Sequence, residues 1–367
     1  MDQGTEMLRA WEIWKNKEIT MLGPTASPEV NGRHFFNGSV VYYWLVGLGL
    51  LTRWEPVGIA WGLAIMSLIS LGFWWLAVRS CWGEKTAWIM VLIWTLLPKA
   101  IDFGPLIWNP NMLLILTGPI AFFWTKRNYV GLGIMLGLAL QCHFQAGLII
   151  ILIGITMMLR KCGGIEWLKI IVGGIVGYAP LLIFDIRNNF YNIKTLGEWL
   201  VTPKKDFGVQ EFYFLEFLPL LVALVAKFLT KNKSLIRLVI IGLLSWSIYE
   251  VGFLKQAKGM ATDWRYIDLK KTGEIIKKEA GNNFNIVNTL SGDIRFYPLR
   301  YWLIKEGKAP MAENKYENMG EVWVVKYNLQ STIINLQSEP WELEVNKDKK
   351  VAGTWKINDK VELVRLK

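Results

Sequence analysis

The first two thirds of the chain alternate between long apolar runs and short polar connections. The apolar runs lie at 57–78, 86–98, 112–124, 129–141, 146–159, 168–184, 212–229 and 235–254. Apolar runs separated by short polar turns predict helices that cross a membrane. Several runs fall below the roughly 20 residues that cross a bilayer as one straight helix, which indicates short or broken helices around a cavity.

Basic residues concentrate in every second connection between the apolar runs, and this distribution predicts the topology. The basic residues of these connections are Arg79, Lys85, Lys126, Arg127, Arg160, Lys161, Lys231, Lys233 and Arg237. Cytoplasmic loops carry the Lys/Arg excess, so these turns are expected inside. Residues 1–56, 99–111, 142–145, 185–211 and everything after about 255 are then expected outside. The apolar run Val40–Thr52 would break this alternation if it crossed, so it is predicted to be a juxtamembrane or re-entrant segment.

The N-terminal segment is polar and amphipathic. Thr5–Lys17 is predicted to be a helix, Leu22-Gly23-Pro24 ends it, and Asn31-Gly32 is a turn signal. No signal peptide or apolar span precedes this segment in the sequence. Because the segment has to reach the outer face, we expect that a first transmembrane helix is missing ahead of Met1.

The pattern changes near residue 258, where charged residues become frequent. Helices are predicted at Asp268–Glu279 and Leu299–Ile304, and strands at Phe284–Val287, Val322–Val325, Trp341–Val345, Thr354–Ile357 and Val361–Leu366. The expected fold is therefore an α-helical polytopic membrane protein with about eight spans and a small C-terminal α/β domain. Its predicted parts are a first outer loop with amphipathic and juxtamembrane helices (1–56), a transmembrane body (57–254) and an extracytoplasmic domain (258–367).

Composition supports a membrane protein. Hydrophobic residues make up 53% of the 367 residues, charged residues 19%, and the mean hydropathy is +0.28, whereas a soluble domain carries more charge. The net charge of +11 does not point to nucleic acid, because much of the excess lies in the turns that set orientation. Cys81, Cys142 and Cys162 have no disulfide or metal spacing and are expected to be small apolar fillers.

The predicted outer loops hold the candidate chemistry, beginning with Asp2. An aspartate at the start of a helix is often a cap, but this one could also be a general base that takes a proton from an attacking hydroxyl. Glu6 lies one helical turn further along, where it could orient a substrate or simply be solvated. The segment with Arg33 and His34 leads into aromatic residues that could stack on a sugar or anchor the chain at the membrane surface.

Two further outer loops carry polar side chains at the ends of apolar runs. Asn109 and Asn111 flank a proline and could hydrogen-bond sugar hydroxyls or lock their loop. Gln141, His143 and Gln145 interrupt an otherwise apolar stretch, and polar residues at such a place are by default a candidate site. They do not form a zinc motif, which needs three or four ligands.

Arg187 is a candidate phosphate clamp, since a guanidinium binds phosphate oxygens bidentately. Arg33 and Lys99 compete for this role, and pairing of Arg187 with Asp185 is the alternative. No Walker loop, glycine-rich dinucleotide turn, nucleophile elbow or His-Glu-x-x-His motif occurs in the sequence, so ATP-driven transport, hydride transfer, and serine or zinc hydrolysis lack support.

Together these segments resemble the GT-C membrane glycosyltransferases, and within them the bacterial relatives of protein O-mannosyltransferases and lipid A aminoarabinose transferases (family 39-like). The resemblance covers roughly residues 1–200. It rests on Asp2-Gln3-Gly4 with Glu6, Leu22-Gly23-Pro24, Phe36-Asn37-Gly38 before Tyr42-Tyr43-Trp44, Trp108-Asn109-Pro110-Asn111, Gln141-Cys142-His143-Phe144-Gln145, and Pro180-Leu181-Leu182-Ile183-Phe184-Asp185 with Asn189-Phe190. Two departures are the absent first helix and the glutamine at position 3, where many members have a second carboxylate.

The resemblance implies an inverting glycosyltransferase of the cell envelope with Asp2 as catalytic residue. It would move a monosaccharide from a polyprenyl-phosphate carrier to a protein, lipid or glycan acceptor at the outer face of the plasma membrane. The substrate-binding residues would be Glu6, Arg33, His34, Asn109, Asn111, Gln141, His143, Gln145 and Arg187. The partners are then the lipid-linked donor, the acceptor and the bilayer, without nucleic acid, and a divalent cation is the one cofactor left open. A polyprenyl-lipid transporter or flippase and a membrane-anchored binding protein are the alternatives.

Overall fold

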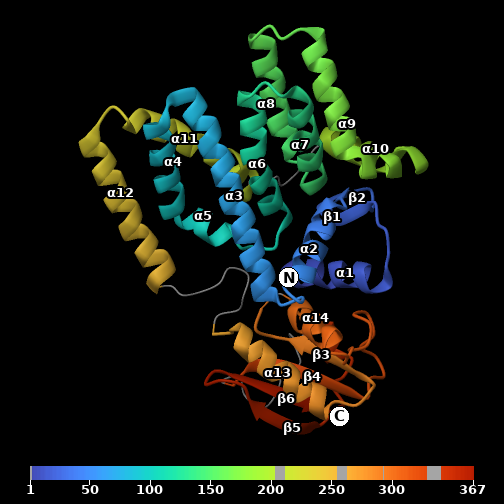
Figure 1. Cartoon of the computed structure of the whole chain (residues 1–367). Helices are drawn as coiled ribbons and strands as arrows, with labels where there is room; N and C mark the ends of the chain where they lie inside the picture. Colours follow the sequence, from blue (N-terminus) through green and yellow to red (C-terminus); the bar gives the residue numbers. More distant parts are fainter. Residues whose placement is uncertain (1, 203–210, 254–262, 292, 329–339) are drawn as a thin grey trace. The chain divides into compact units, whose positions relative to one another are not determined.

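The computed structural model describes residues 2–202, 211–253, 263–291, 293–328 and 340–367 (Figure 1). The chain is mostly helical and has a small sheet near its C-terminus, as predicted. It divides into two compact units, one formed by 1–11 with 256–367 and the other by 12–255. The helix α1 (Asp2–Asn16) contributes residues to both units. The three-part division expected from the sequence stays a prediction.

In the helical unit, each predicted apolar run is helical over most of its length. Its helices are α2 (Val40–Leu51), α3 (Pro56–Trp82), α4 (Glu84–Leu96), α5 (Pro98–Phe103), α6 (Asn109–Thr125), α7 (Tyr129–Cys142), α8 (Ala146–Leu159), α9 (Gly164–Arg187), α10 (Tyr191–Val201), η1 (Glu211–Phe217), α11 (Leu218–Leu229), α12 (Lys233–Ser247) and η2 (Ile248–Phe253). Among the described residues, α3 and α9 are long and apolar enough to cross a bilayer. Shorter apolar helices are α2, α7 and α8.

Glycines bring α7 and α9 into backbone contact. Gly133 and Gly137 of α7 face Gly173 and Gly177 of α9, and the two glycines on each helix are separated by three residues. A Cβ atom built on Gly177 would lie 2.2 Å from the carbonyl oxygen of Ile134, and one on Gly173 would lie 2.2 Å from that of Val130. No side chain fits there, so the two helix backbones pack directly on each other. This small-xxx-small pattern is typical of helix pairs in membranes.

A β-hairpin follows α1 where the sequence predicted only a loop with a turn. Strands β1 (Leu22–Val30) and β2 (Arg33–Gly38) pair antiparallel. Asn31 and Gly32 join them with φ angles of 50° and 74°. Positive φ at both central residues suits a type I′ turn, which matches the twist of paired strands.

The C-terminal unit is a four-stranded sheet covered by helices. The strand order is β3 (Phe284–Asn288), β4 (Glu321–Tyr327), β6 (Val361–Leu366) and β5 (Val351–Lys356). The β3–β4 pair is parallel and the other pairs are antiparallel. The helices α13 (Tyr266–Glu279) and α14 (Tyr297–Lys305) pack Leu269 and Leu299 against Phe284 and Trp323 in the core on one face. A second core on the other face includes Val287, Tyr316 and Val324.

The strand predicted at Trp341–Val345 is wrong. The residues Trp341–Glu344 form a short helix, α15, with Pro340 at its N-cap. Proline before the first turn and the acidic residues Glu342 and Glu344 within it favour a helix start. Of the apolar residues whose alternation suggested a strand, Leu343 is buried and Trp341 is exposed.

Glu321 of β4 is a buried carboxylate that pairs with two basic residues, Arg365 and Lys367. Its carboxylate accepts hydrogen bonds from Arg365 at 2.7 and 3.0 Å and from the indole of Trp323 at 3.2 Å, and it lies 3.1 Å from Lys367. Burial acts to raise the pKa of Glu321, but the hydrogen bonds from Arg365 and Lys367 outweigh it and hold the pKa at about 2. These bonds link β4 to β6 across the sheet.

We expect the C-terminal unit to lose stability in acid through Glu321. A depressed pKa stabilises the folded state above the ordinary value of 4.5, and this contribution is lost as the pH falls from 4.5 toward about 2. The measurement is hydrogen–deuterium exchange of β4 and β6 in the full chain, corrected for intrinsic rates. Glu321→Gln should raise exchange already at pH 7, whereas Glu344→Gln, an exposed control, should not. Equal exchange in both variants would contradict the role of Glu321.

Candidate functional site

The hairpin, the end of α9 and the helix α10 are joined by polar side chains. The Asn192 amide pairs with the backbone of Phe36 in both directions, accepting from its N–H at 2.6 Å and donating to its carbonyl at 3.0 Å. The hydroxyl of Tyr191 donates to the carbonyl of His34 at 3.2 Å. The side chains of α10 thus take the place of a third strand beside β2 and fix its position.

Asp185 holds the start of α10. One carboxylate oxygen accepts from the backbone N–H of Asn192 at 2.7 Å and from that of Ile193 at 3.4 Å. The side chain is fully buried, and its other oxygen has no hydrogen-bond partner among the described residues. The predicted alternative for Asp185 was an ion pair with Arg187. The bonded oxygen of the Asp185 carboxylate caps the start of α10 instead.

Gln141 lies where three elements meet. Its amide nitrogen donates to the carbonyl of Gly177 on α9 at 2.5 Å. A Cβ atom built on Gly38 of β2 would lie 2.4 Å from its amide oxygen, so the absence of a side chain at Gly38 makes room for this amide. Gln141 is 1% exposed. Its described contacts therefore position α7, α9 and β2 on one another.

The turn between α7 and α8 buries a histidine and a glutamine. The imidazole Nδ1 of His143 accepts from the backbone N–H of Gln145 at 3.3 Å, and burial lowers the pKa of His143 to about 4. The imidazole is therefore neutral near pH 7. The side chain of Gln145 is only 4% exposed, yet neither its amide oxygen nor its nitrogen has a hydrogen-bond partner among the described residues. A buried amide without partners is costly in a folded chain.

Aromatic rings surround this turn. The ring of Phe144 lies 5.5 Å from that of Phe35 on β2 and 5.5 Å from that of Trp199 on α10, and it stacks on the imidazole of His143 at 4.4 Å. Phe35 and Trp199 are 6.0 Å apart. We call His143 and Gln145 with these three rings the hairpin site. It combines neutral hydrogen-bonding groups with flat apolar faces.

The two asparagines at the start of α6 have different surroundings. Asn111 is fully buried, and its amide nitrogen donates to the carbonyls of Leu106 at 2.9 Å and Gly104 at 3.4 Å. It therefore locks the preceding loop. Asn109 is half-buried, and its amide oxygen has no hydrogen-bond partner among the described residues. The amide oxygen of Asn111 likewise has no partner among the described residues, but Asn111 is fully buried, so the half-buried Asn109 is the more accessible of the two.

The candidate cations also differ. Arg33 forms an ion pair with Glu198 of α10, so its charge is already matched. Arg187 is exposed at the end of α9 and forms no ion pair with a described residue. The imidazole of His34 lies 3.6 Å from the carboxylate of Glu29, and its side chain is 42% exposed. Lys99, the third candidate, is half-buried on α5. Of the three predicted phosphate clamps, Arg187 is thus the exposed one that forms no ion pair with a described residue.

Asp2 and Glu6 belong to the unit that contains the C-terminal sheet. Asp2 is the first residue of α1, and its side chain lies outside the described residues. Glu6 is buried, not solvated. Gly4, between them, lies against α14, since a Cβ there would meet the backbone nitrogen of Pro298 at 2.5 Å. Within the described part of the chain, no three His, Cys, Asp or Glu side chains gather closely enough to hold a metal ion.

The contribution of α10 to the hairpin site was not predicted from the sequence. Asn192, Glu198 and Trp199 all act on the hairpin from this helix. Asn192, Thr195 and Trp199 recur at helical spacing in a segment assigned to a loop, and that spacing was the available signal. Comparison of the chain with protein-family models, with curated proteins and with solved structures gives no match.

Proposed function

We propose that the chain is a polytopic membrane glycosyltransferase of the GT-C type. It would move a monosaccharide from a polyprenyl-phosphate carrier to an acceptor at the outer face of the plasma membrane. The single observation that carries this proposal is the hairpin site, where the buried amide of Gln145, which has no hydrogen-bond partner in the described part of the chain, lies in a turn lined by aromatic rings. Sugars offer flat apolar faces to rings and paired hydroxyls to amides.

The surface of the helical unit supports the membrane part of the proposal. Large apolar side chains point outward from several helices, including Trp61 of α3 at 68%, Ile151 of α8 at 59%, Ile165 of α9 at 57% and Leu238 of α12 at 67% exposure. Large apolar side chains exposed on several helices are typical of a membrane or protein contact. The glycine contact of α7 with α9 is likewise typical of membrane helices, and the basic turns set the orientation.

The proposed reaction inverts the anomeric centre. The resemblance assigns the base to Asp2, which would take the proton of the acceptor hydroxyl as the hydroxyl oxygen bonds to the anomeric carbon and the bond to the carrier phosphate breaks. The leaving group departs as the polyprenyl phosphate and needs charge stabilisation more than an acid. Arg187 is the proposed partner of that phosphate, because Arg33 is already paired with Glu198. His143 and Gln145 hold the sugar hydroxyls.

Replacing Gln145 with methionine tests the sugar-binding role. Methionine keeps the length of the side chain and removes both amide atoms, which have no hydrogen-bond partner within the described ranges, so folding stability should hold or rise. The lost hydrogen bonds should lower the transfer rate at subsaturating donor about tenfold. The measurement is transfer from undecaprenyl-phosphate mannose, glucose and aminoarabinose by the purified full chain, together with its thermal midpoint.

Gln141→Met is the matched control. Its amide bonds the carbonyl of Gly177, so this variant should lower the thermal midpoint. Parental transfer by Gln145→Met would remove Gln145 from the site. If the parent turns over none of the three donors, the assignment of the donor class fails.

One observation favours a polyprenyl-lipid transporter as the second candidate. A cavity of about 390 Å³ with mostly apolar walls lies among α3, α6, α8 and α11, and the buried carboxylate of Glu216 lines it. One oxygen of Glu216 has no hydrogen-bond partner among the described residues. A buried ionisable residue beside such a cavity is typical of transport proteins. Movement of polyprenyl phosphate across proteoliposomes without any sugar transfer would decide for it.

A further inference from the structure

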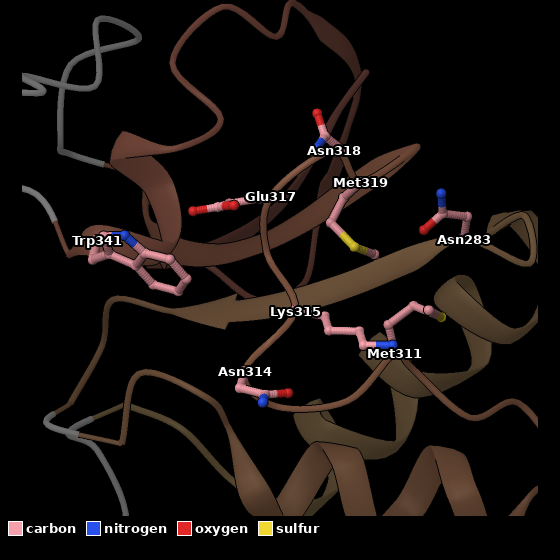
Figure 2. A pocket seen from close by; sticks show the side chains of 8 residues that line it. All are labelled: Asn283, Met311, Asn314, Lys315, Glu317, Asn318, Met319 and Trp341. Atoms are coloured by element: carbon pink, nitrogen blue, oxygen red, sulfur yellow. The ribbon is translucent and has the colours of Figure 1, made fainter.

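The C-terminal unit contains a second candidate site, distant in sequence from the hairpin. A pocket of about 450 Å³ opens beside the edge strand β3, and Figure 2 shows its lining. It is lined by Asn283, Met311, Asn314, Lys315, Glu317, Asn318, Met319 and Trp341. Most of these residues come from the connection 306–320 between α14 and β4, which has no helix or strand of its own. Long irregular connections in compact domains are often binding loops.

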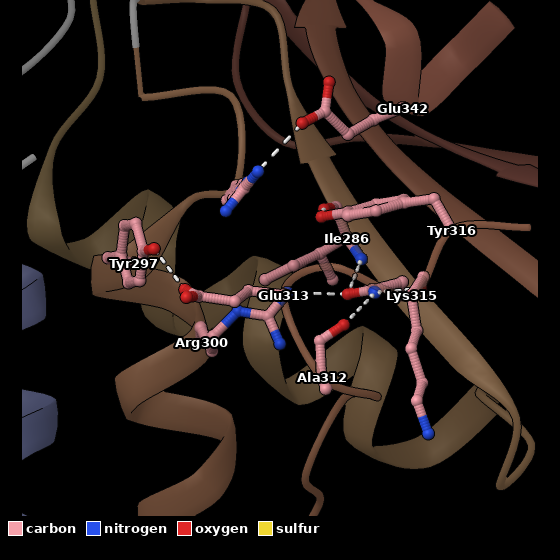
Figure 3. A network of polar contacts seen from close by, with 10 residues as sticks. Ile286, Tyr297, Arg300, Ala312, Glu313, Lys315, Tyr316 and Glu342 are labelled. Carbon is pink, nitrogen blue, oxygen red and sulfur yellow. Dashed lines mark hydrogen bonds and ion pairs between the residues drawn. The ribbon is translucent and has the colours of Figure 1, made fainter. Parts of the chain in front are cut away.

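Two buried side chains hold this loop in place (Figure 3). Arg300 of α14, 3% exposed, donates to the carbonyl of Met311 at 2.6 Å and to the amide oxygen of Asn285 at 2.6 Å. The amide nitrogen of Asn285 in turn donates to the carbonyls of Lys315 at 2.8 Å and Ala312 at 3.2 Å. An arginine and an asparagine are thus buried to hold three carbonyls of the pocket loop.

A second pair of buried residues anchors the loop to the sheet and to α15. The hydroxyl of Tyr316 donates to the carbonyl of Ile286 in β3 at 2.8 Å. The amide of Asn346 donates to the carbonyl of Tyr316 at 2.9 Å. The ring of Tyr316 also meets that of Trp341 edge to face at 6.2 Å. A loop fixed in this way loses little entropy when it binds a ligand.

The side chains that face the pocket select a class of ligand. Asn283, Asn314 and Asn318 are exposed amides, each able to donate and accept. Trp341 is 44% exposed and offers one indole face. The charges of Lys315 and Glu317 balance. We propose that this pocket binds a neutral saccharide of one or two rings, with Trp341 stacked on a ring face and the asparagines bonding its hydroxyls.

Other ligand classes fit the lining less well. A single lysine beside a glutamate does not favour a phosphate or other anion. A peptide that extends a sheet needs a free edge strand, but Met311 and Ile294 already bond the backbone of β3 at Phe284 and Asn288. A volume of about 450 Å³ lies in the range of small-molecule pockets. The proposal is independent of sugar transfer at the hairpin site, because it concerns binding alone.

The test is saccharide binding to the full chain in nanodiscs, where no sugar detergent competes. The probes are mannobiose, cellobiose and N,N′-diacetylchitobiose, measured by calorimetry and by saturation-transfer NMR. We expect at least one probe to bind the parent, Trp341→Ala to weaken it about tenfold or more, and Asn283→Ala to weaken it about fivefold. Because the ligand is neutral, added salt should change the affinity less than twofold.

Trp61→Ala is the matched control, since Trp61 is an exposed indole of the helical unit and its loss should leave binding unchanged. Parental affinity in Trp341→Ala, or binding of none of the three probes, would overturn the proposal. So would competition of the probe by an unstructured peptide at equal concentration. A chain that binds saccharide without transferring sugar would refute the proposed function and leave this site standing.

Discussion

Replacing Gly177 with alanine is expected to separate α7 from α9 and to disorder the hairpin site. The new Cβ would lie 2.2 Å from the carbonyl oxygen of Ile134. This neighbour is backbone, so the helices have to move apart. Gln141 donates to the carbonyl of Gly177 itself, so the shift reaches the turn with His143. Overpacking of this kind should lower the thermal midpoint by about 5 to 10 °C.

The matched control is Gly242→Ala on α12, where nothing lies within 4 Å of the added Cβ. Alanine in an open helical position improves helix propensity by about 1 kcal/mol, so this variant should be as stable as the parent or more so. Differential scanning fluorimetry of both variants gives the comparison. An unchanged midpoint in Gly177→Ala would show that the two backbones do not touch.

Replacing Asp2 with asparagine is expected to lower sugar transfer by about 100- to 10,000-fold, the usual contribution of a general base. Asparagine keeps the shape and hydrogen-bonding capacity but cannot take a proton at neutral pH. Expression and binding of the polyprenyl-phosphate sugar should stay at the parental level, because the proposed donor contacts come from Gln145, His143 and Arg187. The measurement is single-turnover transfer with donor binding determined separately.

Glu12→Gln on the same helix is the control and should leave the transfer rate unchanged. Turnover by Asp2→Asn equal to that of the parent would exclude Asp2 as base, while loss of both binding and transfer would mean that the residue is needed for folding.

The helices were the most predictable part of the fold, because length and hydropathy decide them locally. The run 146–159 became α8 with the same bounds, ending before the basic turn at Arg160. The strands of the hairpin were not predictable in the same way. Gly23, Pro24 and Pro28 interrupt β1, and each of these residues counts against a strand. Only the Asn31-Gly32 turn gave a local signal.

The contacts between elements were less predictable than the elements. The sequence marked the polar residues of this helix end as a candidate site, which stays a prediction, but it did not indicate that His143 and Gln145 are buried there. Nothing local distinguishes Asn111, which locks a loop, from Gln145, whose amide has no described partner. That difference depends on distant backbone, as does the pairing of Asn192 with Phe36 across 156 residues of chain. Sequence periodicity carries no information about such long-range partners.

The burial of Cys142 has a practical consequence. This thiol is 0% exposed and lies between Gln141 and His143, whereas Cys81 is exposed at the far end of another helix. An alkylating reagent in solution reaches Cys142 only when the packing around the turn transiently opens. The ratio of the alkylation rate of Cys142 to that of Cys81 in the same molecule therefore measures how often the region that we propose holds the sugar opens.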